Sequence, residues 1–259
     1  MTQLARPDLA RRRSERDDAC PGAASATAER LPPDHGGQLR ADGAVPGWAV
    51  GTALLAPVVL IGGWLIADAL QPTSYSPMRQ TMSVLAGQPG TDRWVMTAAL
   101  VLVGSSQIAT GAGLLAVGMP ARVLLILTGL STLGVAATPE PATGPTWQHL
   151  AFAGSCVVTT AIWPVLVARR GPDQPWLVSV AGCAALTVIF AGLSCWVLIA
   201  AKDGGGDLGM VERLTSAVQG TLPLAVALAL RQALRAARRG QRASPALAGS
   251  YADRPKASP

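Results

Sequence analysis

The sequence predicts an all-α fold, a polytopic integral membrane helical bundle of about six transmembrane helices. Half of the 259 residues (50%) are hydrophobic and only 14% are charged. The apolar residues gather in long runs, and a run of about 20 such residues crosses a hydrocarbon core of about 30 Å as a helix. Soluble domains rarely combine this composition with such runs.

Six stretches have the required length and composition. They cover residues 48–70, 94–117, 121–137, 147–168, 176–201 and 214–230. Residues 1–46 instead carry Arg, Asp, Pro and Gly without an apolar run of signal-peptide length, so we expect a disordered tail followed by a retained membrane anchor. The predicted domains are this tail, a transmembrane domain over residues 47–230, and a basic tail over residues 231–259.

The distribution of positive charge predicts that both termini lie in the cytoplasm, because Lys and Arg are retained there during insertion. In this topology, the outer segments hold only Arg79, Arg93, Lys202 and Arg213 among the 21 basic residues. All seven tryptophans also fall near an end of a predicted span, where indole rings favour the headgroup boundary. We therefore expect a multi-pass protein of the cell membrane, of the inner or plasma-membrane type.

The predicted partners follow from the same charges. Four arginines after the last span recur at helical spacing and share one face of a helix: Arg231, Arg235, Arg238 and Arg242. Such a stripe favours the anionic lipid headgroups of the bilayer at about 1 kcal/mol per residue near the surface. It carries no interleaved aromatic residues for stacking bases, which argues against nucleic acid. A membrane protein partner stays open.

Short polar signatures between the apolar runs carry a resemblance. The run SYSPMRQTMSVLAG (residues 74–87), followed by DRWVMTAALVLVG (92–104), resembles a bacterial and archaeal family of membrane proteins catalogued as domain of unknown function 998. The segments HLAFAG, IWPVLVARR and GMVERLTSAVQ agree with it. The likeness covers roughly residues 47–235 and implies a six-helix membrane domain with a patterned first outer loop, but no established activity or ligand.

The predicted spans hold no Asp, Glu, Lys or Arg near mid-membrane, which argues against proton-coupled transport. Gln107 and Gln219 are polar residues at comparable depth in two spans that run in the same direction. A buried amide needs partners. The two glutamines therefore either line a cavity or form hydrogen bonds between helices.

His149 is the one histidine outside the N-terminal tail, and it opens the fourth span on the predicted outer side. There it comes within reach of Asp68, Glu140, Ser83 and Glu212. It could serve as a general base for a serine, or it could be a hydrogen-bond partner of a lipid headgroup or a loop. A zinc site needs three protein ligands, and nucleotide-binding and nucleophile-elbow motifs are missing, so we expect no metal and no cofactor.

The predicted first outer loop, residues 71–93, is the least generic segment. We expect a short interfacial helix over residues 77–85, with Ser76 and Pro77 as its cap and first turn. This helix either covers an outward pocket as a lid or simply seals the helix ends.

We also expect Glu212 and Arg213, just before the last predicted span, to form an ion pair with Arg79 or Asp68. Such a pair would pin the first outer loop against the bundle.

These observations favour a non-enzymatic membrane protein with no assigned catalytic residue, whose outward polar patch recognises a lipid headgroup, a small molecule or a membrane partner. A small transporter or channel is one alternative, and a membrane-embedded lipid-modifying enzyme is another. The candidate ligand-binding residues are Asp68, Arg79, Ser83, Gln107, His149, Glu212 and Gln219.

Overall fold

The structure is a computed structural model that describes residues 45–172, 174–203 and 206–252, with side chains described as far as Arg239. In this part of the chain it is all-helical, and six helices are long and apolar enough to cross a membrane. They are α1 (Gly47–Ala69), α3 (Trp94–Gly113), α4 (Met119–Ala137), α5 (Trp147–Val167), α6 (Val180–Lys202) and α7 (Leu208–Ala252). The predicted fold class is confirmed. The predicted disordered tail lies outside the described residues, except for its last two, and the predicted domain limits stay a prediction.

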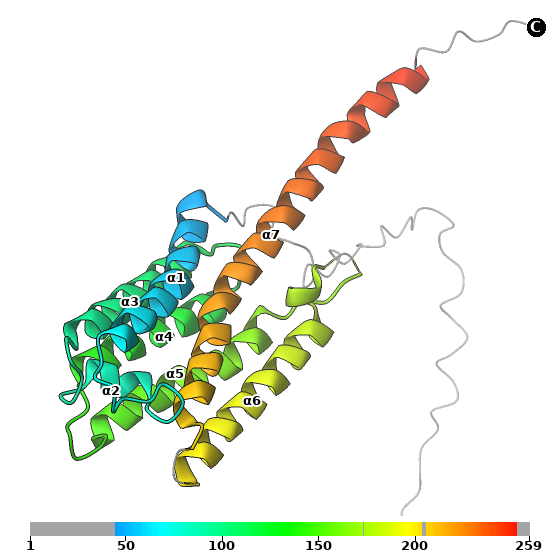
Figure 1. Ribbon diagram of the computed structural model, residues 1–259. Helices are drawn as coiled ribbons and strands as arrows, with labels where there is room; N and C mark the ends of the chain where they lie inside the picture. Colours follow the sequence, from blue (N-terminus) through cyan, green and yellow to red (C-terminus); the bar gives the residue numbers. More distant parts are fainter. Residues whose placement is uncertain (1–44, 173, 204–205, 253–259) are drawn as a thin grey trace, which may run out of the picture. The chain divides into compact units, whose positions relative to one another are not determined.

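The six long helices form a closed ring. Each packs most extensively against two others, in the order α1, α3, α4, α5, α6, α7 and back to α1 (Figure 1). In hydrocarbon, each helix satisfies its backbone hydrogen bonds internally, so side chains alone decide how neighbours fit. A ring leaves room for side chains from several helices to meet at its centre.

Helices α3 and α4 approach each other closely at two glycines. A Cβ atom at Gly129 would lie 2.5 Å from the carbonyl oxygen of Gly104, and one at Gly104 would lie 2.7 Å from that of Gly129. Small residues allow such close approach of membrane helices.

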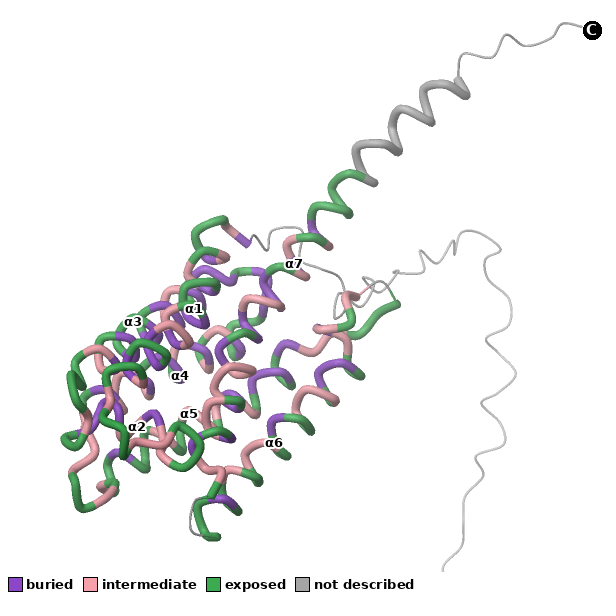
Figure 2. Tube along the Cα trace, in the orientation of Figure 1, coloured by how far each residue is buried: buried purple, intermediate pink, exposed green. Residues whose placement is uncertain are grey.

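Exposed residues occur along the long helices (Figure 2), and many of them are large and apolar, such as Val188 of α6, which is 71% exposed. These surfaces contact the lipid bilayer. The tryptophans that begin helices are exposed as expected, whereas Trp163 and Trp64 are buried. Trp163 donates its indole N–H to the carbonyl oxygen of Ala121 at 2.9 Å, so it joins α5 to α4 instead of facing lipid.

The ends of several spans differ from the prediction, and α7 differs most. It begins at Leu208 and runs without a break to Ala252, whereas the sequence predicts a span that ends at residue 230. The segment after residue 230 is rich in Ala, Leu and Arg, which favour helix, so nothing stops it there. Arg235 and Arg238 are exposed on this continuation.

The cap loop, defined as residues 71–93, closes one end of the ring and contains α2 (Met82–Ala86). Its base is joined by Gln71 and Thr91, whose side-chain amide and backbone groups exchange two hydrogen bonds of 3.0 Å. Because α2 begins only at Met82, the predicted helix over residues 77–85 is wrong in its first half. Ser76 and Pro77 are not its cap, because this stretch forms turns whose carbonyls are used by another part of the protein.

Candidate functional site

Arg213, in the second turn of α7, is the centre of a polar cluster at the cap-loop end. Its Nη2 donates to Asp68 Oδ1 at 2.8 Å and to the Tyr75 hydroxyl at 2.5 Å, and its Nη1 donates to the carbonyl oxygens of Pro77 and Gln80 at 2.8 and 2.9 Å. One guanidinium thus joins α7, α1 and the cap loop. The predicted pair with Asp68 is found, and the alternative pair with Arg79 is not.

The ion pair is largely withdrawn from solvent, with the side chain of Arg213 11% exposed and that of Asp68 17% exposed. Burial raises the pKa of Tyr75 to about 12, so its phenol keeps its proton at neutral pH. The positive charge therefore faces one carboxylate and one neutral hydroxyl. Among the described residues, the buried Nε of Arg213 has no hydrogen-bond partner.

Glu212, the neighbour of Arg213, fixes the start of α2. Its Oε2 accepts the backbone N–H of Met82 at 2.6 Å, so a carboxylate from α7 takes the place of a local cap for this helix. Gly209 lets α7 approach closely, since a side chain there would collide with the carbonyl groups of Gln80 and Pro77. The first two turns of α7 thus hold the cap loop through the charged side chains of Glu212 and Arg213 and through close packing at Gly209.

His149 binds the cap loop from α5. Its Nδ1 lies 2.7 Å from the carbonyl oxygen of Thr138, and its Nε2 lies 2.9 Å from Ser83 Oγ. A carbonyl only accepts, which assigns the proton to Nδ1 and, in the neutral ring, leaves Nε2 to accept from the Ser83 hydroxyl. His149 is 3% exposed, whereas Ser83 is partly exposed.

Glu140 belongs to the same region. Its carbonyl oxygen accepts the backbone N–H of Gln88 at 2.8 Å, which ties the α4–α5 loop to the cap loop. Burial raises the pKa of its carboxyl group, and the nearby charge of His149 lowers it by a smaller amount.

Arg79 differs from the other predicted residues of this end. It is exposed, and its guanidinium has no hydrogen-bond or ion-pair partner among the described residues. Asp68, Ser83, His149 and Glu212 fasten the cap loop, whereas Arg79 projects from it.

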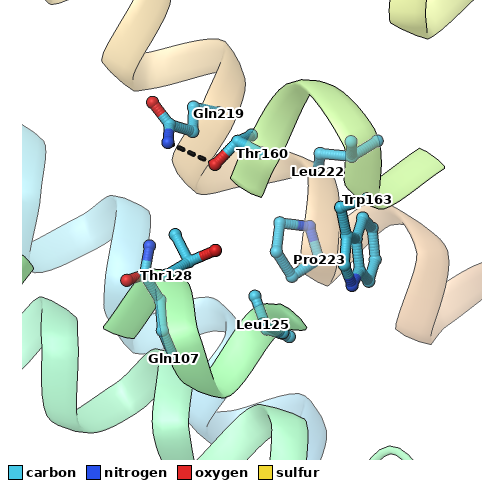
Figure 3. Close-up of a pocket in the computed structure, with 8 residues that line it drawn as sticks. All are labelled: Gln107, Leu125, Thr128, Thr160, Trp163, Gln219, Leu222 and Pro223. Atoms are coloured by element: carbon cyan, nitrogen blue, oxygen red, sulfur yellow. Dashed lines mark hydrogen bonds between the residues drawn. The ribbon is translucent and has the colours of Figure 1, made fainter. Parts of the chain in front are cut away.

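Gln107 and Gln219 lie elsewhere, at a cavity of about 10 Å³ inside the ring (Figure 3). Gln107 is about 20 Å along α3 from the cap-loop end. Its Oε1 accepts the Thr132 hydroxyl at 3.1 Å, while Gln219 donates to the Cys156 carbonyl oxygen at 3.0 Å and to the Thr160 hydroxyl. Such a cavity has room for about one water molecule. Gln107 and Gln219 thus both line the cavity, and each also forms a hydrogen bond to a neighbouring helix.

Sequence reasoning missed Tyr75 and the threonines around the cavity. Tyr75 has no local pattern that marks it, because its partner Arg213 is far away in the sequence. Thr132 and Thr160 look like ordinary small residues in apolar spans. Within the described residues, no group of three or more His, Cys, Asp or Glu is placed to hold a metal ion.

A family model described as "Protein of unknown function (DUF998)" matches residues 54–229. The chain belongs to this family. The matched DUF998 region contains every residue of the cap-loop cluster and of the central cavity, and it bears out the resemblance seen in the sequence. No curated protein and no solved structure matches the chain.

In this DUF998 protein, we predict that Arg213→Met releases the cap loop. The substitution leaves Asp68 as a buried charge without its partner, which costs roughly 3–5 kcal/mol in proteins. Trypsin should then cleave after Arg79 faster than in the wild type, while cleavage after Arg93 at the start of α3 stays unchanged. Lys202→Met, at the exposed end of α6, is the matched control. Unchanged cleavage after Arg79 would show that Arg213 does not hold the loop.

We also predict that Glu140→Gln raises the melting temperature at pH 7. A folded-state pKa above the ordinary value of 4.5 means that Glu140 contributes its full stability below that value and loses it as pH rises through the folded pKa. The gain from Glu140→Gln should therefore shrink towards pH 4.5. Asp92→Asn, at an exposed carboxylate, is the control. A gain that does not vary with pH, measured by thermal unfolding, would argue against this explanation.

Proposed function

We propose that this membrane protein recognises the phosphate of a lipid headgroup through the tip of its cap loop, residues Met78 and Arg79. The observation that carries the proposal is that this tip is held on both sides and is itself exposed. Arg213 binds the carbonyl groups of Pro77 and Gln80, which flank the tip. The backbone N–H of Met210 also donates to the Met78 carbonyl oxygen at 3.2 Å.

The chemistry of the two tip residues suits a membrane surface. Met78 is 49% exposed and offers an apolar side chain to the boundary between headgroups and hydrocarbon. Arg79 offers a planar guanidinium that can bind a phosphate through two hydrogen bonds. Because the backbone is already fixed, binding orders only these two side chains, and the entropic cost is small.

We further propose that the cap loop faces the outside of the cell membrane and that both termini lie in the cytoplasm. This orientation is supported by the concentration of Lys and Arg in the tails and in the loops at the opposite end. The exposed Arg235 and Arg238 on the continuation of α7 then lie on the cytoplasmic side, where anionic headgroups are their proposed partners.

The transporter or channel alternative rests on Gln107 and Gln219. Both amides line the central cavity, which is what a polar path would require. Its volume of about 10 Å³ gives room for a water molecule and not for a larger solute, so the described conformation supports recognition at the cap loop better than passage through the ring.

We predict that Arg79→Ala lowers the retention of phosphatidylglycerol by about tenfold, since a hydrogen bond to a charged group contributes about 1.5–3 kcal/mol. Native mass spectrometry of the detergent-solubilised full-length protein measures the retained lipid. Arg79→Lys should give an intermediate value, because an ammonium group lacks the planar fork.

Arg93→Ala is the matched control, since Arg93 is also an exposed arginine of the cap loop but lies at the start of α3. Equal retention by the Arg79 and Arg93 variants would refute the proposal. Melting temperatures of both variants should match that of the wild type, because neither side chain is among those that hold the cap loop against the helices.

A further inference from the structure

We infer that Ser83 and His149 form a nucleophile and general-base pair that attacks acyl esters at the membrane surface. This inference goes beyond headgroup recognition and does not depend on Arg79. It rests on the geometry of the pair. Ser83 Oγ lies 2.9 Å from the imidazole Nε2, the distance at which a base removes a hydroxyl proton.

The tautomer and the orientation of the base are both fixed. The Thr138 carbonyl oxygen holds the proton on Nδ1 at 2.7 Å, so Nε2 presents its lone pair to Ser83. This backbone carbonyl occupies the orienting position that a carboxylate fills in Ser-His-Asp triads. His149 is 3% exposed, so its ring is also held by packing.

The hydroxyl of Ser83 does not make the bond that several other helical hydroxyls make to their own helix. Ser105 and Thr215, for example, donate to the carbonyl group four residues earlier in the same helix. Such back-bonding is the usual way for a helical hydroxyl to be satisfied in a membrane. Within the described residues, Ser83 Oγ has the imidazole as its hydrogen-bond partner, and the residue is partly exposed. Its position is fixed from α7, because Glu212 binds the adjoining Met82 N–H.

The carboxyl group of Glu140 lies near enough to His149 for a positive charge on the imidazole to lower its pKa. In its ionised form it stabilises the imidazolium ring that exists after proton transfer. The imidazole and the fixed helix start therefore meet at one partly exposed serine.

The position of the pair indicates the substrate class. His149 lies in the first turn of α5, next to the exposed Trp147, which marks the level of the headgroup boundary. The ester bonds of membrane lipids lie at this boundary. A lipid acyl ester is thus the substrate that meets Ser83 without leaving the bilayer.

The reaction is an acyl transfer. As Ser83 Oγ forms a bond to the carbonyl carbon, its proton passes to His149 Nε2. The tetrahedral adduct collapses with breakage of the ester C–O bond, and the departing alkoxide takes the proton from Nε2 to leave as an alcohol. Water then attacks the acyl-serine in the same way, which releases the carboxylic acid and restores Ser83.

A fluorophosphonate probe tests this inference with the full-length protein in nanodiscs. The expected result is a covalent adduct on Ser83, located by mass spectrometry, and release of fatty acid from a labelled diacyl phospholipid. Ser83→Ala should abolish both. His149→Gln keeps groups that can bind Ser83 and Thr138, but lacks the base, and should slow labelling by about 100-fold or more.

Ser76→Ala, at another serine of the cap loop, is the matched control and should react like the wild type. Melting temperatures establish that each variant is folded, and headgroup retention measured separately keeps a failure here distinct from a failure at Arg79. A folded wild-type protein without an adduct on Ser83 would overturn the inference. So would labelling of His149→Gln at the wild-type rate, because the hydrogen bond would then serve only to hold α2 against α5.

Discussion

The guanidinium of Arg213 sets the arrangement of one whole end of the molecule. A buried positive charge needs a counter-charge and several acceptors, and Arg213 finds them in Asp68 of α1, in Tyr75 and in two carbonyl groups of the cap loop. The first and last spans are thereby joined where the ring closes. Once the loop is held in this way, Glu212 can reach the start of α2 and Ser83 can reach His149. The exposed tip of the loop is also defined by these contacts.

The fold could be predicted from sequence because each membrane span depends on local composition. Twenty apolar residues identify a helix in lipid wherever they occur, and no partner needs to be known. The ends of elements were predicted less well because contacts between distant segments decide them. Residues 77–81 do not continue α2 towards its N-terminus, since Arg213 binds the carbonyl groups of Pro77 and Gln80. Trp163 has the position of an interfacial residue, yet its indole binds the Ala121 carbonyl inside the protein.

The sequence predicts which residues lie at the candidate site better than it predicts which of them contact each other. The alternation of spans places Asp68, Ser83, His149 and Glu212 at the same end of the bundle, and the structure brings Ser83 and His149 into contact. Sequence left open whether Arg213 would pair with Asp68 or Glu212 would pair with Arg79, because that choice depends on the path of the loop. Nor could it assign the tautomer of His149, which follows from a carbonyl oxygen eleven residues away along the chain. Because Arg213 binds Asp68 and His149 binds Ser83, the cap loop is held by other helices and Arg79 stays unpaired among the described residues.

Hydrogen exchange of the wild-type protein in nanodiscs tests the fastening of the cap loop most directly, because it needs no substitution. Loops without tertiary contacts exchange their amide hydrogens rapidly, and held segments exchange slowly. If the α7 side chains hold the loop, the peptide covering residues 74–86 exchanges slowly, with the Met82 amide among its most protected groups. Exchange of this peptide at the rate of an unstructured chain, while α1 and α7 stay protected, would contradict the account.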